Sequence, residues 1–296
     1  TRPLTPSRGF SFRGGGPNPK PMPKRILIQL DCDPQPSTFD AIVAVDAGAE
    51  VLLRHGGVTP ETVVPLVHGA MFTRGGADLT STAIFVGGSD VAAAEAVAAA
   101  VRATFFGPVR VGVLVDPSGA NTTAAAAVIV AFRHLSLGRD PAQAVVLGGT
   151  GPVGQRLGRL LAGKGLRVTL GSRSLERAEA AAKTVREQVP GAQIAGIESH
   201  STVRLDSSLA SVLAAADLVI AAGAARASLL DATGRTAAAK AQVFIDLNAV
   251  LPAGIHGIVA SDKGRADGPA VCYGALGVGG TKMKIHRAAI ERIFQD

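Results

Sequence analysis

Three glycines near the middle of the chain have the spacing of a phosphate-binding turn. They follow the apolar run Ala144-Val145-Val146-Leu147 and precede the amphipathic segment 155–161. In such a strand–turn–helix unit the first glycine permits a tight turn, the second lets a pyrophosphate approach, and the third lets the helix pack closely. Free amides at the helix start favour anionic phosphates. We therefore expect a dinucleotide site, rather than a simple turn, at Gly149, Thr150, Gly151, Pro152, Val153 and Gly154.

The residues after the next predicted strand, 167–170, bear on the choice of dinucleotide. An acid there would accept hydrogen bonds from the ribose hydroxyls and repel a 2′-phosphate. This chain instead has Ser172, Arg173 and Ser174, and its next acid is Glu176. A guanidinium between two hydroxyls suits a phosphate dianion. The sequence therefore predicts NADP, with NAD still able to bind, and a solvated surface arginine is the alternative interpretation.

Composition excludes several other classes of protein. A length of 296 residues predicts about two domains. No segment is long and apolar enough to predict a membrane-spanning helix. Two cysteines, Cys32 and Cys272, and six scattered histidines offer neither a disulfide framework nor the spacing of a metal site. We expect a cytoplasmic protein without a metal.

The net charge of +7 is concentrated at the beginning of the chain. Residues 1–25 hold six cations and no acid, which leaves +1 for the rest. Because this Pro- and Gly-rich stretch cannot bury enough apolar surface to fold, we expect residues 1–23 to be a disordered basic leader. The nearly neutral remainder predicts no binding to nucleic acid.

Strand-type and helix-type segments alternate along the rest of the chain, and this pattern implies right-handed crossovers and parallel sheets. The predicted strands are 24–30, 50–53, 81–86, 109–115, 143–147, 167–170, 193–197, 218–221 and 243–247. The main predicted helices are 39–45, 91–103, 124–134, 155–161, 175–188, 209–214 and 282–294, with Ser37, Thr59 and Ser89 as expected N-terminal caps of three helices. We predict a two-domain α/β protein with a cleft between its domains. Residues 24–137, completed by helix 281–296, would form a substrate domain, and 138–280 a Rossmann-type domain.

Several motifs resemble those of the bacterial NAD(P)-dependent methylene-tetrahydromethanopterin dehydrogenases. They are QLDCD at 29–33, PSTFD at 36–40, FTRGG at 72–76, STAIFVGG at 81–88, NTTAAA at 121–126, GTGPVG at 149–154 and the segment 274–287. The resemblance covers essentially residues 24–294 and implies two domains like those predicted above. It also implies oxidation of a methylene group between two nitrogens of a reduced pterin to the methenyl form, in one-carbon oxidation from formaldehyde.

Such a reaction transfers a hydride and leaves a cation shared by two nitrogens. Since no proton moves in the chemical step, a tuned general acid or base is not required. Rate enhancement should come from holding the donor carbon against the nicotinamide in a dry cleft. A negative or dipolar environment would stabilise the emerging cation.

Candidate residues for these tasks lie where predicted strands end. Asp31 and Asp33 follow the first strand and are catalytic candidates, although solvated turn acids are an equal alternative. We expect Lys282, at the opening of the predicted final helix, to orient the pterin from a position that costs helix stability. The substrate-binding candidates are Thr73, Arg74, Asn121, Thr122 and Thr123. The further cofactor-binding candidates are Ala222, Gly223, Ala224, Asn248, Ala275 and Gly277.

Two other functions are compatible with the glycine turn. One is a different two-domain NADP oxidoreductase resembling shikimate dehydrogenase, which needs a Lys/Asp pair in the first domain. The only lysines before the hinge at 137–141 are Lys20 and Lys24, in or next to the leader. The other is a non-catalytic NADP-binding sensor, in which the pterin-side motifs should have degraded. We also expect a homo-oligomer.

Overall fold

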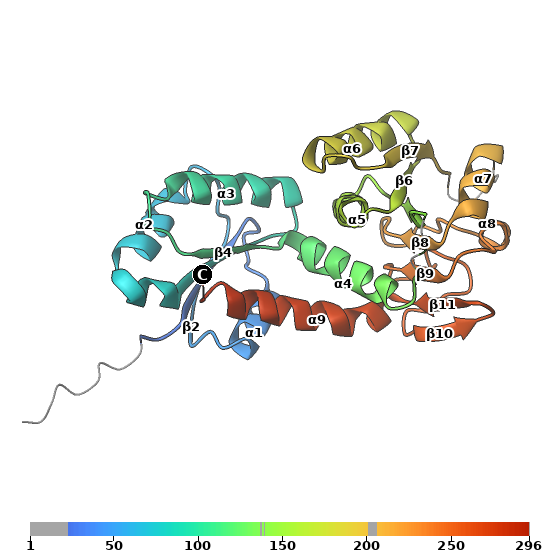
Figure 1. Cartoon of the computed structure of the whole chain (residues 1–296). Coiled ribbons are helices and arrows are strands. Elements are labelled where there is room, and N and C mark those ends of the chain that lie inside the picture. Colours follow the sequence, from blue (N-terminus) through green and yellow to red (C-terminus); the bar gives the residue numbers. More distant parts are fainter. Residues whose placement is uncertain (1–22, 137, 139, 201–205, 296) are drawn as a thin grey trace, which may run out of the picture.

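The computed structural model describes residues 23–136, 138, 140–200 and 206–295. The predicted leader therefore lies, apart from residue 23, outside the described residues, and so does part of the predicted hinge. Two separate sheets form, which confirms the α/β prediction (Figure 1). Among the described residues, no helix is long and apolar enough to cross a membrane.

The first sheet has the strand order β2-β1-β3-β4, and its strands are parallel. They are β1 (Ile26–Asp31), β2 (Val51–His55), β3 (Thr82–Gly87) and β4 (Gly112–Val115). Helices α2 (Val64–Phe72) and α3 (Val91–Thr104) cover one face, where Ile28 and Ile84 are buried. Helix α1 (Thr38–Asp46) and the end of the last helix cover the other, where Leu27 and Phe85 are buried. The central strands β1 and β3 are therefore buried on both faces, as strands of parallel sheets usually are.

The second sheet has the order β10-β11-β9-β8-β5-β6-β7, with β10 antiparallel to β11 and the other pairs parallel. Its strands are β5 (Gln143–Leu147), β6 (Arg167–Ser172), β7 (Ile194–Glu198), β8 (Leu218–Ala221), β9 (Val243–Asp246), β10 (Lys263–Asp267) and β11 (Ala270–Tyr273). One face packs against α4 (Ala120–Phe132), α5 (Pro152–Gly163) and α6 (Leu175–Gln188). The other packs against α7 (Ser207–Ala215) and α8 (Ala232–Ala237).

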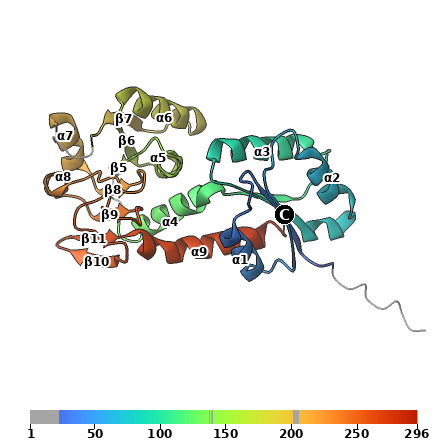
Figure 2. The ribbon, with the colours of Figure 1, turned by 180° about the vertical axis from the view of Figure 1, so that it is seen from behind.

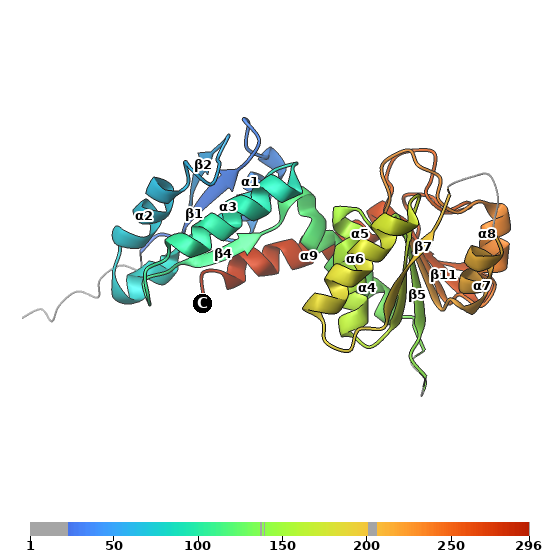
Figure 3. The same ribbon diagram turned by 90° about the horizontal axis from the view of Figure 1, so that it is seen from above.

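Two long helices join the sheets. Helices α4 and α9 (Ala275–Arg292) lie side by side between them in the front, rear and upper views (Figures 1, 2 and 3). Val278, near the start of α9, is buried in the core of the second sheet, whereas Ile290, near its end, is buried in the core of the first. Each end of α9 is therefore fixed to a different sheet.

Two predicted helix caps are wrong, and one is confirmed. Ser37 caps α1 by accepting a hydrogen bond from the Asp40 amide (3.2 Å). Helix α3 is capped by Asp90 rather than Ser89. Thr59 begins a turn, and α2 starts only at Val64, next to a proline that is tolerated in the first turn of a helix.

Helix starts differ from prediction where glycine or polar residues suggest a loop. Helix α4 begins at Ala120 instead of 124, and α9 begins at Ala275 instead of 282. The first part of the predicted substrate-domain helix 281–296, as far as Arg292, thus belongs to a longer continuous helix, and residue 296 lies outside the described residues. Helix α8 and the strands β10 and β11 were not predicted. Strand β10 is exposed and charged, so it lacks an apolar alternation.

Candidate active site

The glycine turn adopts a geometry that needs glycine at several positions. Gly148 has a left-handed φ of 72°, and a Cβ there would lie 2.5 Å from the Gly223 Cα after β8. A Cβ at Gly154 would lie 2.6 Å from the Gly148 oxygen, so this glycine lets α5 approach the turn. Gly149 lies against Leu170, where a Cβ would be 2.8 Å from a side-chain atom. The tight turn is therefore made by Gly148, one residue before the glycine to which the sequence motif assigns it.

Gly151 is different, because a Cβ there would meet no atom closer than 3.6 Å. Packing within the protein does not require a glycine at this position. Gly151 is also the N-cap of α5, and Pro152 occupies the first turn of this helix. No side chain in the described part of the chain caps it. The open space and the uncapped helix start fit a pyrophosphate, because anions bind favourably to helix N-terminal amides.

A cavity of about 460 Å³ lies over this turn. Its lining includes Thr150, Gly151, Pro152, Val153, Ser172, Arg173, Ala222, Gly223 and Ala224 from the predicted cofactor site. The structure thus brings together segments that follow β5, β6 and β8. Gly149 and Gly154 serve the packing of the turn beneath it.

The end of the cavity next to β6 is basic. Arg173 follows β6, and Arg177 lies in the first turn of α6; both are exposed and line the cavity. Within the described part of the chain, neither guanidinium has a hydrogen bond or an ion pair, and both remain available to a ligand. Ser174 accepts a hydrogen bond from the Arg177 amide (3.3 Å) and caps α6. Ser172 and Ser199 add hydroxyl groups to the lining.

Three predicted cofactor residues do not line this cavity. Asn248 closes the loop after β9 by donating to the Pro252 carbonyl (3.0 Å). Ala275 begins α9. Gly277 lies against the Asp262 backbone, because a Cβ there would overlap the Asp262 carbonyl oxygen.

A second cavity, of about 240 Å³, lies at the carboxyl ends of β1 and β3, and we call it the substrate cavity. Its lining residues are Asp33, Ser37, Phe39, Asp40, Gly88, Ser89, Ser118, Gly119 and Lys282. Two of the three predicted catalytic residues, Asp33 and Lys282, therefore lie together. Carboxyl ends of parallel strands are the usual place for ligands in open α/β sheets.

The two aspartates after β1 differ in their roles. Asp31 is fully buried, and its carboxylate accepts hydrogen bonds from the amides of Asp33 (3.0 Å) and Ser37 (2.9 Å). This carboxylate shapes the loop. Asp33 lines the cavity, but its oxygens accept hydrogen bonds from the amide (3.0 Å) and hydroxyl (2.8 Å) of Ser89.

Lys282 lies in the middle of α9, so the predicted conflict with the helix N-terminal dipole is wrong. Its Nζ atom is 4.4 Å from the centroid of the Phe39 ring, a cation–π distance. A Cβ on Gly119 would lie only 3.0 Å from the same Nζ atom. Lys284, by contrast, is exposed and does not line the cavity.

Three further candidates occupy the first turn of α4. Thr122 donates from its hydroxyl to Asp116 Oδ2 (2.6 Å), and Asn121 donates its side-chain amide to the Val115 carbonyl (2.7 Å). Both side chains thus hold the turn between β4 and α4. Thr123 is half-buried in the same turn. None of the three lines the substrate cavity.

Thr73 and Arg74 lie elsewhere. Arg74 Nη1 donates to the carbonyls of Lys24 (2.8 Å) and Ser81 (2.9 Å), which precede β1 and β3. Thr73 ends α2 and donates to Gly69 (2.9 Å). Both residues are therefore at the amino ends of the strands, opposite the substrate cavity.

Ser118 lines both cavities and marks where they meet. It lies in the short 3₁₀ segment Pro117–Gly119 and has a φ of 53°, which is uncommon for a residue with a Cβ. Its amide donates to the Gly88 carbonyl (2.8 Å). Backbone strain of this kind gathers at functional sites. Ser118, Asp40 and Arg177 were not among the predicted site residues. No local motif distinguishes Ser118 or Arg177, and Asp40 belongs to the motif PSTFD at 36–40 without being singled out by it.

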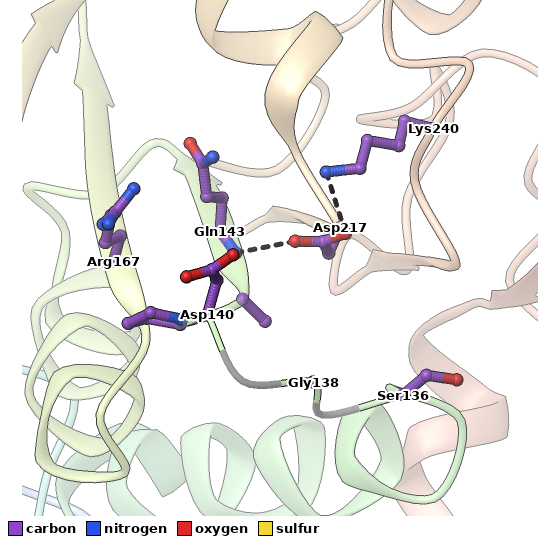
Figure 4. A pocket seen from close by; sticks show the side chains of 9 residues that line it. Ser136, Gly138, Asp140, Gln143, Arg167, Asp217 and Lys240 are labelled. Atoms are coloured by element: carbon purple, nitrogen blue, oxygen red, sulfur yellow. Dashed lines mark hydrogen bonds and ion pairs between the residues drawn. The ribbon is translucent and has the colours of Figure 1, made fainter.

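A third cavity, of about 470 Å³, lies at the amino ends of β5 and β6 (Figure 4). Asp217 accepts a hydrogen bond from the Gln143 amide (2.9 Å) and pairs with Lys240 (3.5 Å) within it. It is at the opposite end of the sheet from the glycine turn, so we do not assign it to the active site. Among the described residues, no group of His, Cys, Asp or Glu could hold a metal ion.

Comparison with known proteins agrees with this arrangement. The family model for the N-terminal part of methylene-tetrahydromethanopterin dehydrogenase matches residues 38–118. The bifunctional protein MdtA of Methylorubrum extorquens is 43% identical over 274 residues, which cover 93% of each chain. The NAD(P)-dependent methylenetetrahydromethanopterin dehydrogenase of the same organism is 32% identical over 270 residues, 89% of each chain. The chain belongs to this dehydrogenase family. The resemblance read from its motifs is therefore confirmed.

Solved structures of other enzymes share the fold of this dehydrogenase-family chain. Quinate dehydrogenase from Corynebacterium glutamicum, in complex with NAD, aligns with a TM-score of 0.52 at 14% identity. The alignment covers 92% of this chain and 98% of that enzyme. At this identity the likeness concerns the fold alone.

Proposed function

We propose that this protein oxidises methylene-tetrahydromethanopterin to the methenyl form with NADP as hydride acceptor. The observation that carries the proposal is the meeting of two cavities at Ser118, each at the carboxyl ends of its own sheet. Membership of the family supplies the substrate class. Methylene-tetrahydrofolate is a second substrate to test, and the reaction would take place in the cytoplasm.

The cavity over the glycine turn, which is the larger of the two that meet at Ser118, would hold the dinucleotide. Gly151 leaves room for the pyrophosphate, and the uncapped start of α5 offers its amides. Arg173 and Arg177 would bind the 2′-phosphate, since two guanidiniums that pair with no other residue in the described ranges suit a dianion. When bound, the nicotinamide supplies the hydride acceptor. NAD would bind more weakly, because it lacks the group that these arginines recognise.

The substrate cavity would hold the reacting end of the pterin. Lys282, held between Phe39 and Gly119, is placed to donate a hydrogen bond to a pterin oxygen and orient the ring. In the chemical step the C–H bond of the methylene group breaks, and its electron pair leaves with the hydrogen as hydride. The substrate becomes a cation shared by two nitrogens. No proton enters or leaves, so positioning and electrostatics must provide the rate enhancement.

The two cavities lie at different sheets, and this placement assigns a separate ligand to each part of the chain. We propose residues 24–137 and the end of α9 as the pterin side, and residues 138–280 as the nicotinamide side. A second copy of the chain is a further expected partner, and its stoichiometry can be measured by sedimentation.

The proposal is tested by following nicotinamide absorbance with each pterin and each coenzyme. Methylene-tetrahydromethanopterin with NADP should give the highest kcat/KM. Methylene-tetrahydrofolate and NAD serve as the comparison substrate and coenzyme. Absence of reduction with either pterin, in protein that binds NADP by calorimetry, would exclude the dehydrogenase function and favour a binding protein.

A further inference from the structure

The carboxyl group of Asp40 does not accept the hydrogen bond from the Ser37 amide that a capping box predicts. In a capping box the third helical residue reaches back to the amide of the N-cap residue. Here Ser37 accepts from the Asp40 amide, but the Ser37 amide donates to Asp31 Oδ2 instead (2.9 Å). The Asp40 carboxyl therefore turns into the substrate cavity, where its side chain is 15% exposed.

The imidazole ring of His286 lies next to Asp40 and, in the part of the chain that the structure describes, is buried without a hydrogen bond that would explain its polar nitrogens. His286 of α9 is fully buried, and neither of its ring nitrogens has a hydrogen-bond partner among the described residues. The ring stacks on Phe85 with 5.7 Å between centroids, and its Nε2 atom is 3.9 Å from Asp40 Oδ1. A movement of about 1 Å would bring this pair within hydrogen-bond distance. Because unpaired buried polar groups are costly, a histidine here suggests a task.

The surrounding charges act on both groups. Burial raises the pKa of Asp40, and Asp116 and Asp31 raise it further, whereas the hydrogen bond with Ser37 and the Lys282 ammonium oppose the rise. Burial also lowers the pKa of His286, with Lys282 adding to the effect and Asp116 opposing it. A neutral imidazole at neutral pH keeps one N–H that can donate to a carboxylate.

We propose that Asp40 is a catalytic residue, whose carboxylate stabilises the positive charge that develops on the substrate, and that His286 is the positioning residue that holds it. The inference rests on the proposed function. As the hydride leaves, the carbon and its two nitrogens acquire one positive charge without any proton transfer. A carboxylate facing that charge lowers the barrier and offsets the repulsion from Lys282. Three other acids lie nearby, and each already accepts hydrogen bonds. Asp31 accepts from backbone amides, Asp33 accepts from Ser89, and Asp116 accepts from the first turn of α4.

The first test is Asp40→Asn, which keeps the shape and removes the charge. Turnover of methylene-tetrahydromethanopterin should fall roughly a hundredfold with little change in KM, because the cation forms only in the transition state. The melting temperature at neutral pH should rise, since an acid whose pKa burial raises is destabilising when ionised. Asp46→Asn is the matched control, because Asp46 lies on the same helix, is exposed and pairs with Arg287. A kcat within twofold of wild type, or a raised KM with normal kcat, would overturn the role of Asp40.

The second test separates positioning from packing at His286. His286→Phe keeps the ring stack on Phe85 but removes both nitrogens, and kcat should fall roughly tenfold. His286→Gln retains an N–H donor and should recover part of this loss. In the Asp40→Asn background, His286→Phe should have almost no further effect, because its role acts through Asp40. Normal kcat for His286→Phe, or an equal loss in both backgrounds, would refute the positioning role.

The failure of this inference can be told apart from failure of the proposed function. Wild-type protein that leaves both pterins unoxidised overturns both. Wild-type turnover with a fully active Asp40→Asn variant overturns only the inference.

Discussion

Arg156 of α5 donates a hydrogen bond from Nε to Asn121 Oδ1, at the start of α4, over 2.5 Å. The same guanidinium pairs with Glu95 of α3 (2.7 Å) and donates to the Pro152 carbonyl (3.0 Å). Helix α3 covers the first sheet and α5 the second, so Arg156 ties the two sides of the active site together. Asn121, which the sequence analysis predicts to bind the pterin, instead accepts this hydrogen bond from Arg156.

Replacing Arg156 with Met should loosen the tie. Loss of its hydrogen bonds to Asn121 and Pro152 should lower the free energy of unfolding by about 1–3 kcal/mol. The pair with Glu95, which is 57% exposed, should contribute little to that loss. Turnover should fall about tenfold, because the spacing of the two cavities is less fixed. Denaturant unfolding and steady-state kinetics measure the two effects.

The control is Arg159→Met on the same helix. Arg159 is exposed and lines, together with Glu95, Asn121 and Arg156, a cavity between α3 and α5. Among the described residues its guanidinium has no ion pair. This variant should keep wild-type stability and turnover. Equal losses of stability and turnover in both variants would show that the effect comes from removing a positive charge from α5. The hydrogen bonds of Arg156 to Asn121 and Glu95 would then not be its cause.

Gly151 and Gly154 should respond in opposite ways to an added methyl group. A Cβ at Gly151 meets nothing within 3.6 Å, so Gly151→Ala should fold with near-normal stability. The methyl group would occupy the space assigned to the pyrophosphate, and NADP affinity should fall at least about tenfold. A Cβ at Gly154 would meet backbone atoms at 2.6 Å, so Gly154→Ala should lower the melting temperature. Calorimetric titration and thermal unfolding distinguish the two, and normal NADP affinity in Gly151→Ala would contradict the assignment of this cavity.

Arg173 and Arg177 should set the preference for NADP over NAD. Losing a charge-assisted hydrogen bond costs about 1.5–3 kcal/mol, so Arg173→Ala should weaken NADP roughly ten- to a hundredfold and leave NAD nearly unchanged. Arg177→Ala should act in the same direction. The double variant should lose less than the sum of the two, because both side chains would bind one phosphate. Equal losses for NADP and NAD in binding titrations would instead indicate structural arginines.

The central strands of both sheets could be predicted because buried parallel strands are short apolar runs. The first and last residues of β5, β8 and α6 agree with the predicted ranges. In α6 the N-cap Ser174 marks the start of the helix. The start of α9 could not be predicted, since its glycines suggest a loop. Gly277 is needed there for close packing on Asp262, a contact between distant segments that sequence spacing does not reveal.

The candidate site was predicted most directly where one segment contains its residues, although Asp33 and Lys282, from distant segments, were also predicted and line the same cavity. The glycine turn and Arg173 are local features, and both line the larger cavity. Arg74 is part of a family motif, but a motif does not say at which end of the sheet it lies. Asp40 and His286 are far apart in the chain, and only the packing of α1 against α9 brings them together.

Lys282 and Lys284 provide a paired test of the substrate cavity. Lys282 lines the cavity, whereas Lys284 is exposed on another side of α9. Lys282→Ala should lower turnover strongly through loss of substrate orientation, while NADP affinity and melting temperature stay near wild type. Lys284→Ala should behave as wild type in the same assays. Near-normal turnover for Lys282→Ala together with an inactive Lys284→Ala would reverse the assignment.

Folding stability should fall in mild acid because of His286. Burial lowers its pKa in the folded state below the ordinary value of 6.5, so the unfolded chain binds the proton more readily. Stability is therefore fully present above about 6.5 and is lost as pH falls from there through the lower folded-state pKa. His286→Phe cannot take up this proton, so its unfolding free energy should depend less on pH across that window. The charged side chains of Asp40, Asp116 and Lys282 face the imidazole. Measuring the pH dependence of unfolding in Asp40→Asn shows how much of it comes from Asp40 rather than from His286. Identical pH dependence of unfolding in wild type and His286→Phe would contradict the neutral state of this buried ring.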